Sequence, residues 1–254
     1  MRDFAAAYLP DADRWCVALS GGPDSLALTA AAAGVRPTTA LIVDHGLQPG
    51  SDRVARTAAD QAMKLGCVGA QVISVKVGTV GGPEGAARTA RYGALDEARA
   101  GAPVLIGHTL DDQAETVLFR AIRGAGVRGA GGMRPIAAVG PGQHVWRPLL
   151  DVPRSALLAY ARAHGLVWVD DPSNADNGFS RNFLRNEVLP LVESRFPGAV
   201  TGLARMGRLC GEAADMLGEL AAEYPLRCGG GGLAVRFEQV AGDSCIVSRR
   251  ALEK

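Results

Sequence analysis

Short apolar runs alternate with longer segments of helical character through the first half of the chain. The apolar runs lie at residues 15–19, 39–44, 71–77 and 103–108, and the helical segments follow them at 24–33, 51–65, 84–100 and 111–122. This alternation is typical of a parallel sheet with helices on both faces, because each helix carries the chain back to the start of the next strand. The pattern therefore predicts an α/β fold built on a doubly wound, mostly parallel sheet. In such sheets ligands bind beyond the carboxyl ends of the strands.

Residues Ser20–Ser25 read Ser-Gly-Gly-Pro-Asp-Ser and join the first predicted strand to the first predicted helix. Unpaired N–H groups and the macrodipole at a helix N-terminus favour an anion such as phosphate. Gly21 and Gly22 permit close approach of the backbone to a ligand, and Pro23 suits a first helical turn. An ordinary glycine turn before a core helix is the alternative. No Gly-Lys-Ser/Thr follows, so the segment is not a Walker loop, and transfer of a γ-phosphoryl group is disfavoured.

Polar side chains also follow the second and fourth predicted strands. They are Asp44 and His45, followed by Gly46, at the end of the second, and His108, Asp111, Asp112 and Glu115 after the fourth. The three acidic residues at 111–115 have i,i+3 and i,i+4 spacing, so they share roughly one face of a helix. Favourable charge at a helix N-terminus accounts for one or two of them. Their place behind a histidine at a strand end is better explained by binding of metal-phosphate or of a substrate amine.

Positive charge is concentrated in the middle of the chain. Residues 120–210 hold twelve arginines and six acidic residues, whereas the whole chain has a net charge of +1. This excess indicates a polyanionic partner. Arg181 and Arg185 lie one helical turn apart in this stretch, with Asn182 beside them, and Arg88 and Arg91 have i,i+3 spacing on the predicted helix 84–100. A solvated surface is the alternative for each of them.

Composition excludes several classes of protein. The five cysteines are odd in number and contain no Cys-x-x-Cys pair, which argues against a disulfide framework, a zinc ribbon or a redox dithiol. No apolar run is long enough to span a bilayer, and the N-terminus lacks the apolar core of a signal peptide. We therefore expect a cytoplasmic protein with no membrane partner.

The second half of the chain is less regular. We expect the glycine-rich residues 123–142 to form a mobile loop rather than a core element. Further elements are predicted as a strand at 145–147 and helices at 153–164, 180–191 and 199–223. Pro197-Gly198 marks a boundary between a catalytic domain at 1–196 and a small helical C-terminal region at 197–254.

These motifs together resemble the tRNA(Ile)-lysidine synthetase family of the PP-loop superfamily of ATP pyrophosphatases. The similar stretches are residues 20–25, 43–47, 84–92, 107–116, 123–126, 132–133, 147–150, 170–174 and 181–185, in the family's order. The Ser-Gly-Gly-x-Asp-Ser loop alone indicates the superfamily. The Asp-Asp-x-x-Glu-Thr run at 111–116 and the Arg-Asn-x-x-Arg run at 181–185 make the resemblance specific.

The resemblance implies a PP-loop fold and an ATP-dependent ligase that requires Mg²⁺. ATP adenylates the wobble cytidine of a tRNA(Ile) with a CAU anticodon, and L-lysine then displaces AMP. The implied catalytic residues are Asp24, Arg88, Asp112 and Glu115, and Asp24 is also the implied metal ligand. The implied ATP-binding residues are Ser20, Gly21, Gly22, Pro23, Asp24, Ser25, Asp44, His45, Gly46 and His108. The implied contacts to substrate or tRNA are Arg91, Asp111, Arg123, Arg181, Asn182 and Arg185.

Other interpretations stay open from the sequence. A tRNA thiolation enzyme of the same superfamily typically needs a reactive cysteine set, and a small-molecule amidating ligase does not need a basic middle region. A nucleotide-binding module without catalysis does not need the acidic set at 111–115. Longer family members carry C-terminal tRNA-binding domains, so we expect residues 197–254 to represent a short form or a truncated chain. Both a monomer and a homodimer are compatible with the sequence.

Overall fold

The computed structural model describes residues 1–46, 50–75, 82–168, 172–222, 227–229 and 232–234. Up to residue 105 its elements are α1 (Arg2–Tyr8), β1 (Trp15–Ala18), α2 (Pro23–Ala33), β2 (Thr38–Asp44), α3 (Ser51–Lys64), β3 (Gly69–Ser74), α4 (Gly82–Ala98) and β4 (Val104–Leu105). They continue with α5 (Leu110–Ile122), α6 (Val127–Ala130), β5 (Ile136–Gly140), β6 (Gln143–Trp146), α7 (Arg154–Ala163) and the 3₁₀ turn η1 (Pro172–Ala175). The last are α8 (Ser180–Phe183), the π-helical turn η2 (Leu184–Val188), α9 (Leu189–Arg195), α10 (Ala199–Ala222), β7 (Arg227–Gly229) and β8 (Gly232–Ala234).

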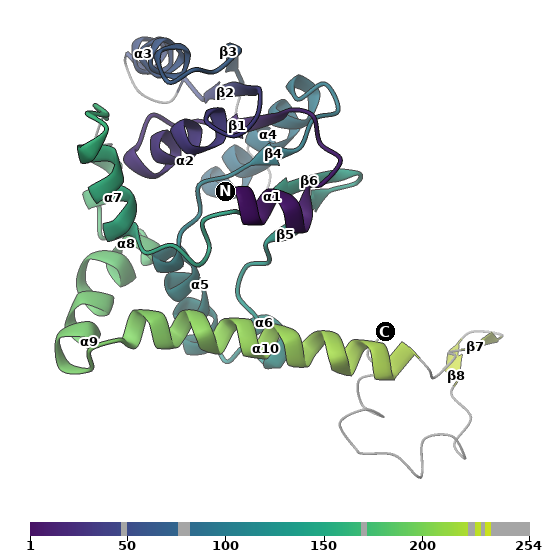
Figure 1. The fold of residues 1–254 in the computed structure, drawn as a ribbon. Coiled ribbons are helices and arrows are strands. Elements are labelled where there is room, and N and C mark those ends of the chain that lie inside the picture. Colours follow the sequence, from purple (N-terminus) through teal and green to yellow (C-terminus); the bar gives the residue numbers. More distant parts are fainter. Residues whose placement is uncertain (47–49, 76–81, 169–171, 223–226, 230–231, 235–254) are drawn as a thin grey trace.

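The central sheet has six strands in the order β3-β2-β1-β4-β6-β5. All neighbouring strands are parallel except β5 and β6, which are antiparallel at one edge. The chain moves outward from β1 to β3 and then returns to place β4 on the other side of β1 (Figure 1). The doubly wound, mostly parallel sheet expected from the sequence is confirmed. The direction of winding reverses between β1 and β4, and this reversal is where such sheets bind ligands.

Helices cover both faces of the sheet, which explains the continuous apolar runs of its strands. Trp15 and Val17 of β1 pack in a cluster with residues of α1, α2 and α7. Cys16, between them in sequence, belongs to a second cluster with Tyr92 and Leu95 of α4. Successive β1 side chains thus enter cores on opposite faces of the sheet.

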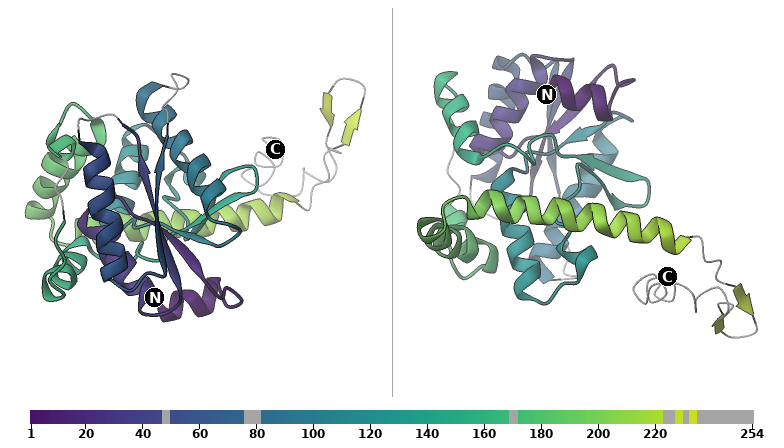
Figure 2. Two further views of the ribbon diagram at one scale, coloured as in Figure 1. Left: turned by 90° about the horizontal axis from the view of Figure 1, so that it is seen from above. Right: turned by 60° about the horizontal axis from the view of Figure 1, so that its bottom comes forward.

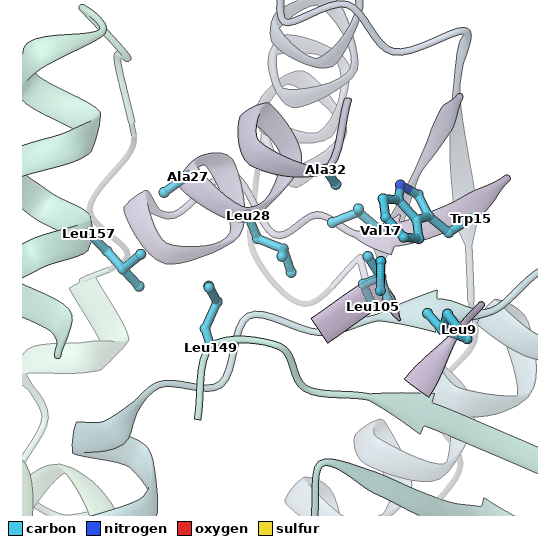
Figure 3. Close-up of a cluster of buried hydrophobic side chains, with 10 residues drawn as sticks. Leu9, Trp15, Val17, Ala27, Leu28, Ala32, Leu105, Leu149 and Leu157 are labelled. Carbon is cyan, nitrogen blue, oxygen red and sulfur yellow. The ribbon is translucent and has the colours of Figure 1, made fainter. Parts of the chain in front are cut away.

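The first cluster fixes α2, and with it the loop at residues 20–25, against the sheet. Figure 3 shows Leu28 of α2 beside Val17 of β1, Leu105 of β4 and Leu149 from the segment before α7. Leu28, Val17 and Leu105 have no exposed surface.

Replacement of Leu28 by alanine is expected to lower the free energy of unfolding by about 3 kcal/mol, because it removes buried apolar surface and leaves a cavity. Val68→Ala is the control: this side chain is 66% exposed, so its loss is expected to change stability by less than about 0.5 kcal/mol. Urea denaturation of the two variants measures the difference. Equal losses would mean that Leu28 does not anchor α2.

The expectation of a loop without core structure at 123–142 is wrong for much of that segment. It contains α6 and the edge strand β5. The Gln113 amide of α5 holds it through two hydrogen bonds, accepting from Met133 N at 2.7 Å and donating to Met133 O at 2.9 Å. Arg120 donates to the carbonyl oxygens of Gly129 and Gly132 at 3.0 and 2.8 Å. The glycines obscured this order in the sequence because the stabilising groups lie on another element.

The helix expected at 180–191 is present but is interrupted by the π-helical turn η2. Pro190, near the start of α9, has no N–H for the carbonyl of Asn186, so a regular α-helical hydrogen bond cannot form there. Single π-helical turns within α-helices often lie at functional sites. This one contains Arg185.

The long helix α10 crosses the body of the molecule and extends beyond it in both views of Figure 2. It packs closely on α5 and α6 at Gly207, where an added Cβ would lie 2.5 Å from Val117 Cγ2 and 3.6 Å from Ala130 O. A Cβ added at Gly211 would lie 2.7 Å from a guanidinium nitrogen of Arg134, which lies between α6 and β5. Arg134 also pairs with Asp215 at 2.7 Å. The helical C-terminal region is confirmed, whereas the domain boundary at residue 197 stays a prediction. In the described ranges no helix combines the length and the apolarity needed to cross a bilayer.

Candidate nucleotide-binding active site

A cavity of about 270 Å³ lies where the winding of the sheet reverses. Its wall is formed by the ends of β1 and β4, the N-termini of α2 and α5, and arginines from α4, α7 and η2. The polar lining residues are Ser20, Asp24, Ser25, Arg91, His108, Asp112, Arg154, Asn174 and Arg185.

The loop after β1 is held in shape by its own residues. Gly21 has a φ of +84°, in the left-handed region that side chains rarely adopt, and Gly22 caps α2. Ser25 Oγ accepts from Ser20 N at 3.2 Å and donates to Gly22 O at 3.0 Å. Gly107, two residues after β4, completes the packing, since a Cβ there would lie 3.4 Å from the backbone of Asp24. The loop is therefore preorganised with the N-terminus of α2 directed at the cavity.

Asp24 places a carboxylate in this cavity with one oxygen unpaired. Oδ2 lies 3.3 Å from Arg154 Nε. Oδ1 is buried and has no hydrogen-bond partner among the described residues. Burial raises the pKa of Asp24, and the charge of Arg154 opposes that rise. A buried acceptor without a partner is costly, so this atom is suited to a cation or to a ligand donor.

Two acidic residues of α5 form a cluster with Arg185. Arg185 donates from Nε to Glu115 Oε1 at 2.6 Å and from Nη2 to Oε2 of the same residue at 3.0 Å. The same Nη2 donates to Asp112 Oδ1 at 2.9 Å. Glu115 is 1% exposed, and burial raises its pKa while the hydrogen bond from Arg185 lowers it. Asp112 borders the cavity, whereas Glu115 lies behind it and acts on the cavity through Arg185.

The acidic run also has the structural role expected of acids at a helix N-terminus. Asp112 Oδ2 accepts from Thr109 N at 2.8 Å, and Thr109 Oγ1 accepts from Asp112 N at 3.2 Å, which together form a capping box. Asp111 Oδ2 accepts from Arg154 N at 2.7 Å and so joins α5 to the start of α7. Asp111 is thus engaged in structure, and Asp112 divides its two oxygens between the cap and Arg185.

His108 lies on the cavity wall and contacts a buried arginine. Arg147 Nε donates to His108 Nδ1 at 3.0 Å, and Arg147 is 4% exposed. Burial lowers the pKa of His108 to about 3, so the ring is neutral at physiological pH. His108 can therefore form hydrogen bonds with a bound ligand, but it adds no positive charge to the cavity.

A second cavity of about 630 Å³ adjoins the first. The two cavities share Asn174 and Arg185 in their walls. The second is bordered by the aromatic rings of Phe119 and Phe179 and by the polar side chains of Arg181 and Asn182. Arg181 donates to Thr116 Oγ1 at 2.8 Å, which ties it to α5.

Comparison with known proteins agrees with this geometry. The family model for the PP-loop domain matches residues 2–192. The tRNA(Ile)-lysidine synthase of Mycobacterium tuberculosis (strain ATCC 25618 / H37Rv) is 55% identical over 222 residues, which are 87% of this chain and 67% of that protein. That of Mycobacterium leprae is 49% identical over 259 residues, covering 99% of this chain and 77% of that protein. The chain belongs to the tRNA(Ile)-lysidine synthase family.

A solved structure shows the same fold at greater distance. The U34-tRNA thiolase NcsA from Methanococcus maripaludis, with its [4Fe-4S] cluster, aligns with a TM-score of 0.61 over 82% of this chain and 76% of that chain. Its sequence identity is 20%, so the likeness shows the PP-loop fold alone. The sequence relationship to the lysidine synthase family is much closer.

The structure brings together many of the residues predicted for a lysidine synthase. Those bordering the first cavity are Ser20, Gly22, Pro23, Asp24, Ser25, Arg91, His108, Asp112 and Arg185. Arg181 and Asn182 border the second. The roles of all these residues in the reaction stay predictions.

Other predicted residues do not border either cavity. Asp44 Oδ1 accepts from Gly46 N at 2.9 Å, which forms a tight turn after β2 and lowers the pKa of Asp44. Burial lowers the pKa of His45 beside it. Arg88 lies over the Tyr92 ring at 4.8 Å, and Arg123 lies over the Phe119 ring at 5.2 Å. Arg123 is therefore near the second cavity, whereas Arg88 lies on an exposed part of α4.

Three polar residues of the site were not among the sequence candidates. Arg154 and Asn174 border the first cavity, and Arg147 contacts His108. Arg147 and Asn174 fall in stretches similar to the family, which is a signal that points to them. Arg154 follows Pro153 at the start of a helix, where nothing in the local sequence distinguishes it from a surface arginine.

Proposed function

We propose that this chain uses ATP and L-lysine to convert the wobble cytidine of a CAU-anticodon tRNA(Ile) to lysidine. The cytidine O2 attacks the α-phosphorus of ATP, so that an O–P bond forms and pyrophosphate leaves. The ε-amine of lysine, after loss of a proton, then attacks C2, and AMP leaves with the former O2. The product carries a new C–N bond, so the activity is that of a ligase.

One observation carries this proposal: the PP-loop borders the same cavity as Asp112 and Arg185, which Glu115 holds from behind, in a chain 55% identical over 222 residues to a tRNA(Ile)-lysidine synthase. The α2 N-terminus is suited to phosphates, and Arg91, Arg154 and Arg185 add positive charge around them. Asp112 is 18% exposed in its side chain and is the acid of the cluster within reach of a lysine ammonium. Glu115 instead holds Arg185 in place.

The donor set fits Mg²⁺ that is bound together with ATP. The described residues contain no group of three His, Cys, Asp or Glu side chains able to hold a metal by themselves. Mg²⁺ usually takes one or two carboxylates and completes its shell with substrate phosphates and water, and Asp24 Oδ1 offers such a carboxylate oxygen. When bound, Mg²⁺ neutralises charge on the departing pyrophosphate.

The second cavity fits the acceptor nucleotide of the tRNA. Proteins bind unstacked bases on aromatic rings and hold the adjoining phosphates with arginine. Phe179 is 52% exposed at this cavity, and Arg181 lies beside it. A base bound there lies next to Arg185 and thus next to the ATP cavity.

Phe179→Ala is expected to raise the KM for tRNA by about tenfold, since stacking on an aromatic ring contributes about 1–3 kcal/mol per base. The KM for ATP is expected to stay unchanged. Phe196→Ala is the matched control, because Phe196 is 63% exposed and does not border this cavity. Steady-state kinetics with each substrate varied in turn give the comparison. An equal effect of the two variants on the KM for tRNA would mean that the acceptor base does not bind in the second cavity.

Nucleoside analysis of CAU-anticodon tRNA after incubation with ATP, Mg²⁺ and L-lysine tests the function directly. Lysidine and AMP are expected to appear in equal amounts, and only when tRNA and lysine are both present. AMP formed at the same rate without tRNA would exclude lysidine synthesis. Thiolated nucleosides would favour the thiolase alternative instead. Homodimerisation and cytoplasmic residence stay predictions from the sequence.

A further inference from the structure

Arg147 is a buried arginine that donates hydrogen bonds to a histidine and a carbonyl; burial lowers its pKa, and the nearby Tyr92 side chain opposes that shift. Arg147 directly follows β6 and is 4% exposed. Nε donates to His108 Nδ1 at 3.0 Å, and Nη1 donates to Arg134 O at 2.9 Å. Within the described residues no carboxylate forms an ion pair with it. Buried arginines are rarely found without such a partner, so the contact with His108 needs a functional explanation.

This contact determines which nitrogen of His108 carries the proton. A guanidinium N–H can only donate, so Nδ1 of His108 must accept and is unprotonated. The low pKa of His108, caused mainly by burial, keeps the ring neutral. A neutral imidazole with Nδ1 unprotonated carries its proton on Nε2. The remaining ring nitrogen is therefore a hydrogen-bond donor.

That donor is free to serve a ligand. No described residue forms a hydrogen bond with Nε2, and His108 borders the cavity that also contains Ser20 and Asp24. We infer that Arg147 is a positioning residue that locks His108 as its Nε2–H tautomer, and that His108 thereby donates a hydrogen bond to a phosphate oxygen of ATP. The inference depends on the proposed function only for the identity of the nucleotide.

The arrangement is suited to a site that already holds several cations. Arg91, Arg147 and Arg181 all disfavour a positive charge on His108, and Asp112 alone among the nearby charges favours it. A neutral donor adds a fixed hydrogen bond without adding repulsion to the arginines. Donors that are oriented before the reaction stabilise developing charge without reorganisation.

Two variants of Arg147 separate its donor from its charge. Glutamine has an amide nitrogen at the same distance along the side chain as arginine Nε, whereas methionine has a carbon there. Arg147→Gln therefore keeps the donor and loses the charge, and Arg147→Met loses both. In ¹⁵N NMR spectra, His108 Nδ1 is expected to keep a pyridine-type shift in Arg147→Gln and to move toward a pyrrole-type shift in Arg147→Met. With four histidines in the chain, the signals can be assigned by substitution.

Nucleotide binding provides the functional readout. Arg147→Met is expected to bind Mg·ATP about tenfold more weakly than Arg147→Gln, because it loses an oriented hydrogen bond from His108 to a charged phosphate oxygen. Equal affinities, or an unchanged tautomer in Arg147→Met, would overturn the inference. If Arg147→Met does not fold, variants of His108 decide: His108→Gln carries a donor near Nε2 and His108→Asn carries it near Nδ1. Tighter binding by His108→Gln supports the inference, and equal binding refutes it.

The binding assay contains neither tRNA nor lysine, so this test is independent of lysidine formation. Wild-type protein that binds ATP but forms no lysidine would refute the proposed function and leave the role of Arg147 standing. If the wild type forms lysidine but Arg147→Gln and Arg147→Met bind Mg·ATP equally well, the proposed function stands and the role of Arg147 is refuted.

Discussion

Arg185→Ala is expected to lower kcat/KM for lysidine formation by about three orders of magnitude. Arg185 neutralises two carboxylates at once, bonding Glu115 through two nitrogens and Asp112 through one of the same two. Removing one partner of a buried ion pair costs about 3–5 kcal/mol, because the other charge stays buried without compensation. If the transition state is destabilised by the same amount, the rate falls by about a thousandfold. Arg185→Lys is expected to recover part of the activity, since an ammonium restores the charge but not the paired geometry.

The stability of Arg185→Ala is expected to rise as the pH is lowered. Burial already raises the pKa of Glu115 above its ordinary value of 4.5, and the loss of Arg185 removes the main group that opposes this rise. At a pH between 4.5, the ordinary pKa of a glutamate in the unfolded chain, and the higher pKa of Glu115 in the folded variant, Glu115 binds a proton only in the folded state. Folding is favoured by that proton, so the effect is full below 4.5 and is lost as the pH rises through the folded-state pKa.

Arg181→Ala is the matched control for this pH dependence. Arg181 lies one helical turn away and donates to the Thr116 hydroxyl rather than to an acid, so its loss leaves Glu115 paired with Arg185 and removes only a smaller effect of charge on the pKa of Glu115. Thermal unfolding of both variants at about pH 5 and about pH 7.5 measures the effect. If Arg181→Ala gains as much stability on acidification as Arg185→Ala, Glu115 is not the titrating group.

The fold was predictable because its main signals are local. The alternation of apolar runs with helical segments places β1 to β4 and α2 to α5 correctly. The side chains of β1, β2 and β4 are largely buried, whereas those of the edge strand β3 are partly exposed. The helix α1 was not predicted. The order in α6 and β5 was hidden because Gln113 and Arg120 stabilise them from another part of the chain. Contacts of this kind leave no periodic trace in a sequence.

The candidate site was predictable as a set of residues but not as a set of roles. Position after a strand end brought Ser20, Asp24, His108 and Asp112 into one cavity, as expected from the sheet alone. The same reasoning included Asp44, whose carboxylate is instead used in the turn with Gly46. The difference between Asp112 at the cavity and Glu115 behind it depends on which way α5 is rotated, and the sequence does not give that rotation.

Asp24→Asn is expected to abolish ATP–pyrophosphate exchange in the presence of tRNA, with a loss of at least about a thousandfold. The substitution keeps the shape of the side chain and removes its charge. It therefore replaces the anionic oxygen offered to Mg²⁺ by Asp24 Oδ1 with a neutral amide group; that oxygen is buried and has no hydrogen bond to a described residue. Metal-assisted stabilisation of a departing phosphate contributes several kcal/mol, which accounts for the expected size.

The same variant is expected to be at least as stable as the wild type at neutral pH. The pKa of Asp24 is raised above 3.8 by burial, so the folded chain holds this carboxylate as an anion at a cost that rises as the pH passes through that pKa. Asparagine has no charge to bury, so the Asp24→Asn variant does not bear this cost. The free energy of unfolding of the variant, relative to that of the wild type, should therefore increase from low to neutral pH. Replacement of an acid that only stabilises its helix lowers the free energy of unfolding by about 0.3–1 kcal/mol. Loss of activity with unchanged or increased stability therefore indicates an acid that binds a ligand.

Asp52→Asn is the control that makes this distinction testable. Asp52 lies in the first turn of α3 as Asp24 lies in the first turn of α2, but it is 60% exposed and pairs with Arg56 on the same helix. Its replacement is expected to leave pyrophosphate exchange unchanged and to lower stability slightly. If Asp24→Asn behaves in the same way, the carboxylate of Asp24 serves the helix and not the nucleotide. The PP-loop then has to hold ATP through its backbone and hydroxyl groups alone.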